Sequence, residues 1–267
     1  MNQTFSLPRF GRLLRTYFSD NRRQLLANLA LLSVVLIALA CVFYTGNPTS
    51  VDRSRDIPFL LVGWAAWYVF IWQQIEALNH KERAMTYLMQ PASQLEKITL
   101  VWLISGVGFI AAYLITFGIV DAVGVNYVNS RDWPKETPKL SSFYEFNGFH
   151  VPPVLWVFTA LLHPLALVLL LVIRRYSLPA VAVLAFVLFF IGLIINSVIL
   201  GSITGLGETN RTLPFDSFMA VSLESKFQYR KIDLPQPIGN QLRYAVGIIA
   251  VVLLYITAYF RLKEREV

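Results

Sequence analysis

Residues 98–120 read ITLVWLISGVGFIAAYLITFGIV and contain no charged side chain. A helix of this length can cross a hydrocarbon core of roughly 30 Å. Inside a bilayer every backbone N–H and C=O must be satisfied within the segment, so the stretch is predicted to be a transmembrane helix. Five more apolar segments of about 20 residues occur at 24–44, 57–78, 151–173, 177–200 and 241–260.

The composition agrees with six spans. Of 267 residues, 56% are hydrophobic and 15% are charged, whereas a soluble domain usually carries about 25% charged residues. In the alternative, a soluble all-helical protein, six full-length apolar segments would have to form the core of one small domain. The predicted fold class is therefore an all-α integral membrane protein with six transmembrane helices, one transmembrane domain over residues 1–267.

The charged residues between the segments are sorted by sign. If the N-terminus is cytoplasmic, the inner side carries 13 basic and 6 acidic residues, and the rest of the chain carries 10 of each. Because Lys and Arg near span ends set orientation, both termini are predicted to lie inside, with external loops at 121–150 and 201–240. The basic residues border spans instead of forming one patch, which favours anionic lipid over nucleic acid as the partner.

Residues 1–23 precede the first span and are predicted to hold an amphipathic helix in the inner membrane interface. Ser6 is the expected N-cap, with Pro8 in the first turn. A frayed basic tail is the alternative. The predicted membrane anchors of this helix are Arg9, Phe10, Arg12, Leu13 and Tyr17.

The linker between the second and third spans is predicted to hold a short lateral helix, HKERAMTYLM at 80–89, which ends before Pro91. Ser93 and Glu96 then have the spacing of a capping box at the start of the third span. An ordinary loop is one interpretation of 80–89, and a docking helix for a cytosolic partner is the other. In the docking helix, apolar anchors flanked by rim charges would make the contact: Glu82, Arg83, Met85, Leu88 and Met89.

Patterns typical of soluble enzymes are missing from the sequence. It contains no G-x-x-x-x-G-K-[ST], H-E-x-x-H or G-x-S-x-G pattern, and Cys41 is its single cysteine. No catalytic or metal site is therefore predicted. Polar residues at membrane depth are candidates for a substrate path, and the two best placed are His163 and Asn196. The alternatives are a packing role beside a proline kink for His163 and an interhelical hydrogen bond for Asn196.

An interfacial helix, six spans with both ends inside, a lateral inner helix and a large loop before the last span resemble the permease subunits of type-2 ABC exporters. The stretch YLMQPASQLEK at 87–97 looks like the leucine-rich, Pro-Ala-Ser, Glu-Lys stretch of Bacteroidetes members of that family, and FSLPRF at 5–10 is similar to their start. The sizeable loop between spans 3 and 4 departs from the best-studied members.

The resemblance implies a function and partners. Two permease chains, identical or different, would form a dimer in the bacterial inner membrane, and residues 80–89 would couple each chain to a cytosolic ATPase that binds ATP and Mg²⁺. Small side chains allow helices to approach closely, so the predicted dimer contact uses small residues such as Gly63, Ala65 and Ala66, or Gly192. The rivals are a non-transporting scaffold or assembly subunit of an envelope complex and a membrane enzyme acting on lipids. The substrate would be a lipid, an amphipathic peptide or an antibiotic.

Overall fold

The computed structural model describes residues 5–79, 92–134, 137–142, 153–173, 177–204, 218–220, 230–232 and 238–264. This part of the chain is mostly helical, as predicted, and a helix covers all or nearly all of each apolar segment. Within it, the helices long and apolar enough to cross a membrane are Leu7–Phe43 and Gln94–Asn129. The six-span topology stays a prediction.

The chain divides into two compact units, residues 1–151 with 262–267 and residues 152–261. The first unit contains α1 (Leu7–Phe43), α2 (Pro48–Ser54), α3 (Asp56–Asn79), α5 (Gln94–Val101), the π-helix η1 (Trp102–Gly108) and α6 (Phe109–Asn129). The second unit contains α7 (Pro153–Val172), α8 (Ser177–Thr204), β1 (Phe218–Ala220), β2 (Arg230–Ile232) and most of α9 (Ile238–Glu264).

The predicted interfacial helix and the first span form one helix, α1, of 37 residues. No glycine or proline occurs between residues 12 and 43, so nothing in the sequence breaks the helix. Ser6 occupies the N-cap position with Pro8 in the first turn, but its side chain makes no capping hydrogen bond. At 1.5 Å per residue, α1 is roughly 55 Å long, so a large part of it must lie outside a hydrocarbon core of about 30 Å.

Helix also occurs in two stretches that lie outside the predicted spans. Residues 48–54 form α2, which Asn47 caps by accepting a hydrogen bond from the Ser50 N–H at 2.8 Å. The third predicted span, 98–120, continues as α6 to Asn129, nine residues into the predicted loop 121–150. Residues 121–129 contain no proline to stop α6, and their side chains at Asp121 and Val128 are buried in the first unit.

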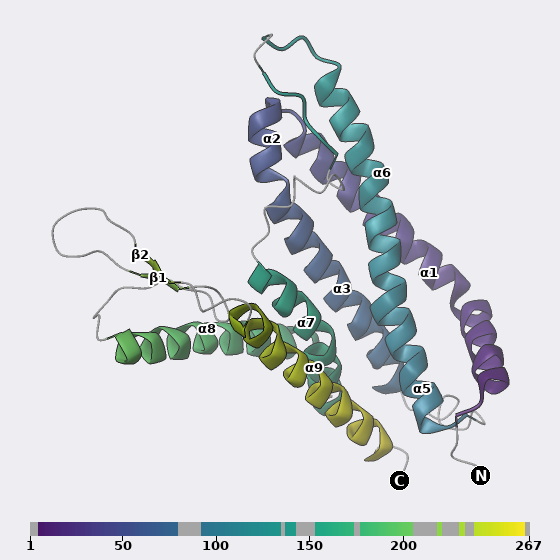
Figure 1. Cartoon of the computed structure of the whole chain (residues 1–267). Helices are drawn as coiled ribbons and strands as arrows, with labels where there is room; N and C mark the ends of the chain where they lie inside the picture. The colour runs from purple at the N-terminus through teal and green to yellow at the C-terminus, as the bar shows by residue number, and fades with distance from the viewer. Residues whose placement is uncertain are drawn as a thin grey trace. The chain divides into compact units, whose positions relative to one another are not determined.

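In the first unit, α1, α3 and α6 run side by side, with α2 at one end (Figure 1). Their shared core contains Leu32, Leu36, Phe59, Tyr113 and Phe117. Gly63 belongs to this packing, because a Cβ there would lie 3.2 Å from the Tyr113 ring. Its small size therefore serves helix packing within the chain, and the dimer contact stays a prediction.

In the second unit, α7 packs against α8. Close packing also joins α7 to α9, because a Cβ added at Gly247 would lie 2.5 Å from the Val157 side chain. Strands β1 and β2 pair antiparallel, with Met219 opposite Lys231. The described part of the predicted external loop 201–240 thus contains a strand pair.

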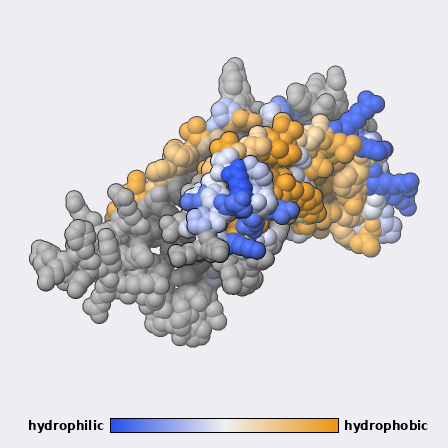
Figure 2. Space-filling model, turned by 90° about the horizontal axis from the view of Figure 1, so that it is seen from above, coloured by the Kyte–Doolittle hydropathy of each residue, from blue (hydrophilic) through white to orange (hydrophobic). Residues whose placement is uncertain are grey.

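The surface carries many exposed apolar side chains, as expected for helices in lipid. Ile115, Ile119 and Val123 follow one face of α6 and are each more than 60% exposed. Figure 2 shows apolar side chains over much of the described surface in that view, with hydrophilic ones at the right, where Figure 1 places the N-terminal part of α1.

Candidate functional site

The start of α5 is fixed by the predicted capping box. The Glu96 N–H donates to Ser93 Oγ at 3.2 Å, and the Ser93 N–H donates to Glu96 Oε2 at 2.8 Å. These reciprocal bonds satisfy two backbone donors that a helix N-terminus would otherwise leave unpaired. The first turn after the inner linker 80–91 therefore has a defined geometry.

The second oxygen of Glu96 holds the beginning of α1. The Ser6 N–H donates to Glu96 Oε1 at 2.6 Å, and Arg9 Nη2 lies 3.1 Å from the same atom. The Glu96 side chain is fully buried, whereas that of Arg9 is 34% exposed. We call the contacts among Ser6, Arg9, Ser93 and Glu96 the inner clamp. It joins two helix starts that are 90 residues apart in the sequence.

The inner clamp favours the charged form of Glu96, which precedes the apolar run that begins at Ile98. Burial alone would raise the pKa of this carboxyl. The N–H groups of Ser93 and Ser6 and the Arg9 guanidinium outweigh burial, and they hold the pKa of Glu96 below its ordinary value. The clamp is therefore an ionic contact at neutral pH.

The predicted membrane anchors divide into two groups. Leu13 is buried against Leu100 and Ile104, and Phe10 and Tyr17 pack on the same cluster. Their apolar face is thus covered by protein, where lipid was expected. The periodicity of the sequence identified this face but not what covers it. Arg9 enters the inner clamp, and Arg12 is exposed.

Two amide side chains of α3 receive hydrogen bonds from α1 near the same end. The Tyr17 hydroxyl donates to Gln74 Oε1 at 2.5 Å, and Asn28 Nδ2 donates to Gln73 Oε1 at 2.7 Å. These bonds fix the position of α1 along α3. One of them lies near the inner clamp and the other lies within the predicted first span.

A cavity of about 910 Å³ lies between α1, α3 and the segment η1–α6, all within the first unit. We call it the lateral groove. Its walls are apolar apart from Arg22 and the Asn28–Gln73 pair. Ala65 and Ala66, predicted at the dimer contact, line its α3 side. Other residues of the groove lining include Leu29, Val35, Val69, Leu103, Ile104, Val107 and Gly108.

The π-helix η1 forms one wall of this groove. Its wider turn lets the Phe109 N–H reach the Ile104 carbonyl five residues back. The Trp67 indole N–H donates to the Ser105 carbonyl oxygen at 2.5 Å, and Ser105 Oγ donates to the Val101 carbonyl at 2.6 Å. Two side-chain donors thus form hydrogen bonds with backbone carbonyl oxygens, one within the π-helix and one just before it. Such turns are frequent at functional sites.

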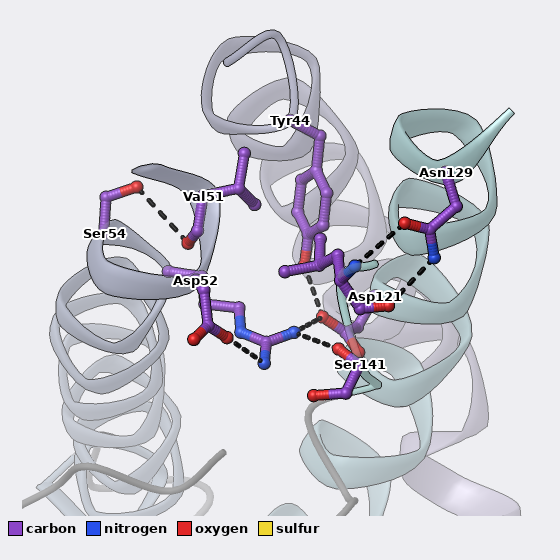
Figure 3. A network of polar contacts seen from close by, with 9 residues as sticks. Tyr44, Val51, Asp52, Ser54, Asp121, Asn129 and Ser141 are labelled. Carbon is purple, nitrogen blue, oxygen red and sulfur yellow. Dashed lines mark hydrogen bonds and ion pairs between the residues drawn. The ribbon is translucent and has the colours of Figure 1, made fainter. Parts of the chain in front are cut away.

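The opposite end of the first unit holds a buried ionic network (Figure 3). Arg55 donates to the Ser141 carbonyl oxygen at 2.8 Å and to Asp52 Oδ1 at 2.9 Å, and its Nη1 lies 3.5 Å from Asp121 Oδ1. The Tyr44 hydroxyl also donates to Asp121 Oδ1. We call this set the outer network. Residues 137–142 are held against α6 by this network and by two hydrogen bonds between the Asn129 side chain and the Leu140 backbone.

In the second unit, His163 is buried in α7 beside Pro164, and its Nδ1 lies 2.8 Å from the Tyr255 hydroxyl of α9. This contact favours the packing interpretation of His163 over a role in a substrate path. Asn196 lies on α8, but its side chain is outside the described residues.

The predicted ATPase contact, Glu82, Arg83, Met85, Leu88, Met89 and Pro91, also lies outside the described residues. Within the described ranges, no three His, Cys, Asp or Glu side chains are placed to hold a metal ion. No protein-family model, curated protein or solved structure matches the chain.

Proposed function

We propose that the chain is the membrane-spanning permease subunit of an ATP-driven exporter in a bacterial inner membrane. Two such chains act as a dimer, and a separate cytosolic ATPase supplies the energy. The observation that carries this proposal is the inner clamp, because Glu96 bonds the start of α1 to the first turn after the inner linker 80–91.

The clamp supplies what coupling needs, which is a stiff connection from a docking segment to transmembrane helices. A force on residues 80–91 passes to Ser93 and Glu96, and from Glu96 directly to Ser6 and Arg9. Since α1 and α5 then move as one body, the groove walls on α1 and on η1–α6, which continues directly from α5, move as well. A flexible junction would dissipate the same displacement.

The absence of a P-loop pattern from the sequence fits a division of labour, because nucleotide chemistry then belongs to the partner. ATP and Mg²⁺ are expected on that ATPase. Several exposed arginines on the N-terminal half of α1, among them Arg12, Arg15, Arg22 and Arg23, suit an inner-leaflet surface of anionic lipid.

Purification from native membranes tests the proposal. A tagged chain, extracted in mild detergent, is expected to bring down a P-loop ATPase in stoichiometric amount, and the complex should hydrolyse ATP. Leu88→Ala should weaken that association, because removal of a central apolar anchor typically costs about 2 kcal/mol of binding. Glu82→Ala, which changes a rim charge, is the matched control and should have a smaller effect.

Two outcomes would contradict the proposal. One is a stable complex with envelope proteins alone, without any ATPase, which would favour the scaffold function. The other is unchanged ATPase binding and activity after residues 80–89 are replaced by a Gly/Ser linker of equal length, since a flexible linker provides no anchors and transmits no force.

A further inference from the structure

We propose that the lateral groove is a specific binding site for one glycerophospholipid of the leaflet that surrounds the N-terminal half of α1. The site is defined by Arg22, the Asn28–Gln73 pair and the apolar walls of α1, α3 and η1–α6. The inference goes beyond the proposed function, because it holds whether or not the chain transports anything.

The order of polar groups along the groove matches the order of groups in such a lipid. Arg22 is the cation of the lining, and a lipid phosphate is an anion whose geometry a guanidinium fork matches. Asn28 follows six residues farther along α1, roughly 9 Å deeper at 1.5 Å per residue, and it is hydrogen-bonded to Gln73 of α3. From Leu29 to Val35 the lining of α1 is apolar.

The Asn28–Gln73 pair has polar capacity beyond its mutual bond. Asn28 Nδ2 donates to Gln73 Oε1 in that bond. An amide side chain offers two N–H donors and a carbonyl acceptor, so the Gln73 NH₂ group is still a donor at the groove wall. Ester carbonyls, which lie just below the phosphate in a glycerolipid, are acceptors of the right kind.

The part of the groove between Arg22 and Val35 fits one leaflet, and Leu14 and Phe18 extend the lining on the other side of Arg22. From Arg22 to Val35 the lining extends roughly 20 Å along α1. A bilayer with its head groups is about 40–45 Å thick, so one leaflet measures about half of that. A lipid whose phosphate contacts Arg22 would therefore end its acyl chains near Val35. An apolar helix of another protein could also fill the groove. It would not by itself bring an anion to Arg22, whereas a phospholipid always carries one.

Native mass spectrometry with phosphatidylglycerol as the probe tests the site. The full chain in detergent is titrated with this lipid, and retained adducts are counted. Arg22→Gln should lower retention about tenfold, equivalent to about 1.4 kcal/mol, because it removes a charged hydrogen bond to the phosphate. Arg23→Gln is the matched control, because Arg23 is exposed on the same helix but does not line the groove, and it should change retention less than twofold.

The apolar part of the site is tested by filling it. Val69→Trp places a large ring in the groove one turn before Gln73, where it would exclude the acyl chains, and it should also lower retention about tenfold. Val34→Trp makes the same change at an exposed position of α1 outside the lining and should retain lipid like wild type. Melting temperature without added lipid verifies folding, and Val69→Phe takes the place of Val69→Trp if that variant does not fold.

Three outcomes would overturn the proposal. Equal loss of lipid in Arg22→Gln and Arg23→Gln would mean diffuse attraction to a basic surface. Wild-type retention in the folded groove-filling variant, Val69→Trp or its substitute Val69→Phe, would mean that the lipid binds elsewhere. Efficient disulfide crosslinking of two copies through Val69→Cys, in a Cys41→Ala background, would mean that a second copy of the chain occupies the groove.

Discussion

The guanidinium Nη1 of Arg55 lies 3.5 Å from Oδ1 of Asp121, and both side chains are at most 2% exposed. A buried charge is tolerated only with a partner, because its desolvation costs several kcal/mol. Arg55 also contacts Asp52, whose side chain is 37% exposed. The two carboxylates differ in burial although they bind the same cation, so they should differ in their contributions to stability.

Asp121→Asn should lower the free energy of unfolding by about 3 kcal/mol, because it leaves the Arg55 charge buried with one fewer counter-charge. Asp52→Asn, the matched change at the exposed partner, should cost less than about 1 kcal/mol. Unfolding in mixed detergent micelles measures both values. Equal losses would show that burial of the pair does not decide its contribution.

Gly124 makes room for the Tyr44 ring, since a Cβ at this position would lie 2.6 Å from a ring carbon. Gly124→Ala should therefore destabilise the first unit by about 1–3 kcal/mol through overpacking. Gly11→Ala is the contrasting control, because nothing lies within 4 Å of the added methyl group. It should stabilise α1 by up to about 1 kcal/mol through helix propensity. Melting temperatures that shift in the same direction for both variants would contradict this account.

The inner clamp should make stability depend on pH. Because the folded protein lowers the pKa of Glu96, the clamp contributes fully above the unfolded carboxyl pKa of about 4.3. The contribution disappears as the pH falls through the lower, folded pKa. Between pH 7 and pH 3, Glu96→Gln should show a smaller fall in melting temperature than wild type.

Asp20→Asn is the control for the pH experiment, because Asp20 is exposed on α1 outside the clamp. It should keep the wild-type dependence of melting temperature on pH. If Glu96→Gln also keeps the full wild-type dependence, the acid-sensitive stability comes from other carboxyl groups.

Local patterns predicted the local structure well. Ser93 and Glu96 form the capping box that their spacing indicates, because both partners lie within one helical turn. The third and fourth bonds of Glu96 come from Ser6 and Arg9, about 90 residues away, and no local pattern contains that information. The sequence therefore predicted the capping-box half of the inner clamp but not the contacts of Glu96 with Ser6 and Arg9.

The outer network had a weaker signal. Arg55 lies just before the second predicted span, and Asp121 lies just after the third. The charge sorting places both span ends on the external side, so a contact between these opposite charges could have been anticipated. Burial of Arg55 depends on Tyr44 and on residues 137–142, whose position the sequence does not reveal. The π-turn at 102–108 likewise depends on a tertiary bond, from Trp67 to the Ser105 carbonyl.

The orientation of the chain can be tested with residues at the two ends of the first unit. In a Cys41→Ala background, Ser130→Cys lies just after α6 on the predicted external side, and Ser19→Cys lies on the predicted cytoplasmic part of α1. Both positions are exposed, so accessibility in the folded chain does not distinguish them. A membrane-impermeant maleimide added to cells whose inner membrane is intact should label Ser130→Cys and spare Ser19→Cys. After lysis it should label both. The reverse pattern in intact cells would place the inner clamp and the linker 80–91 outside, where no ATP-hydrolysing partner could engage them, and the permease proposal would fail with the orientation.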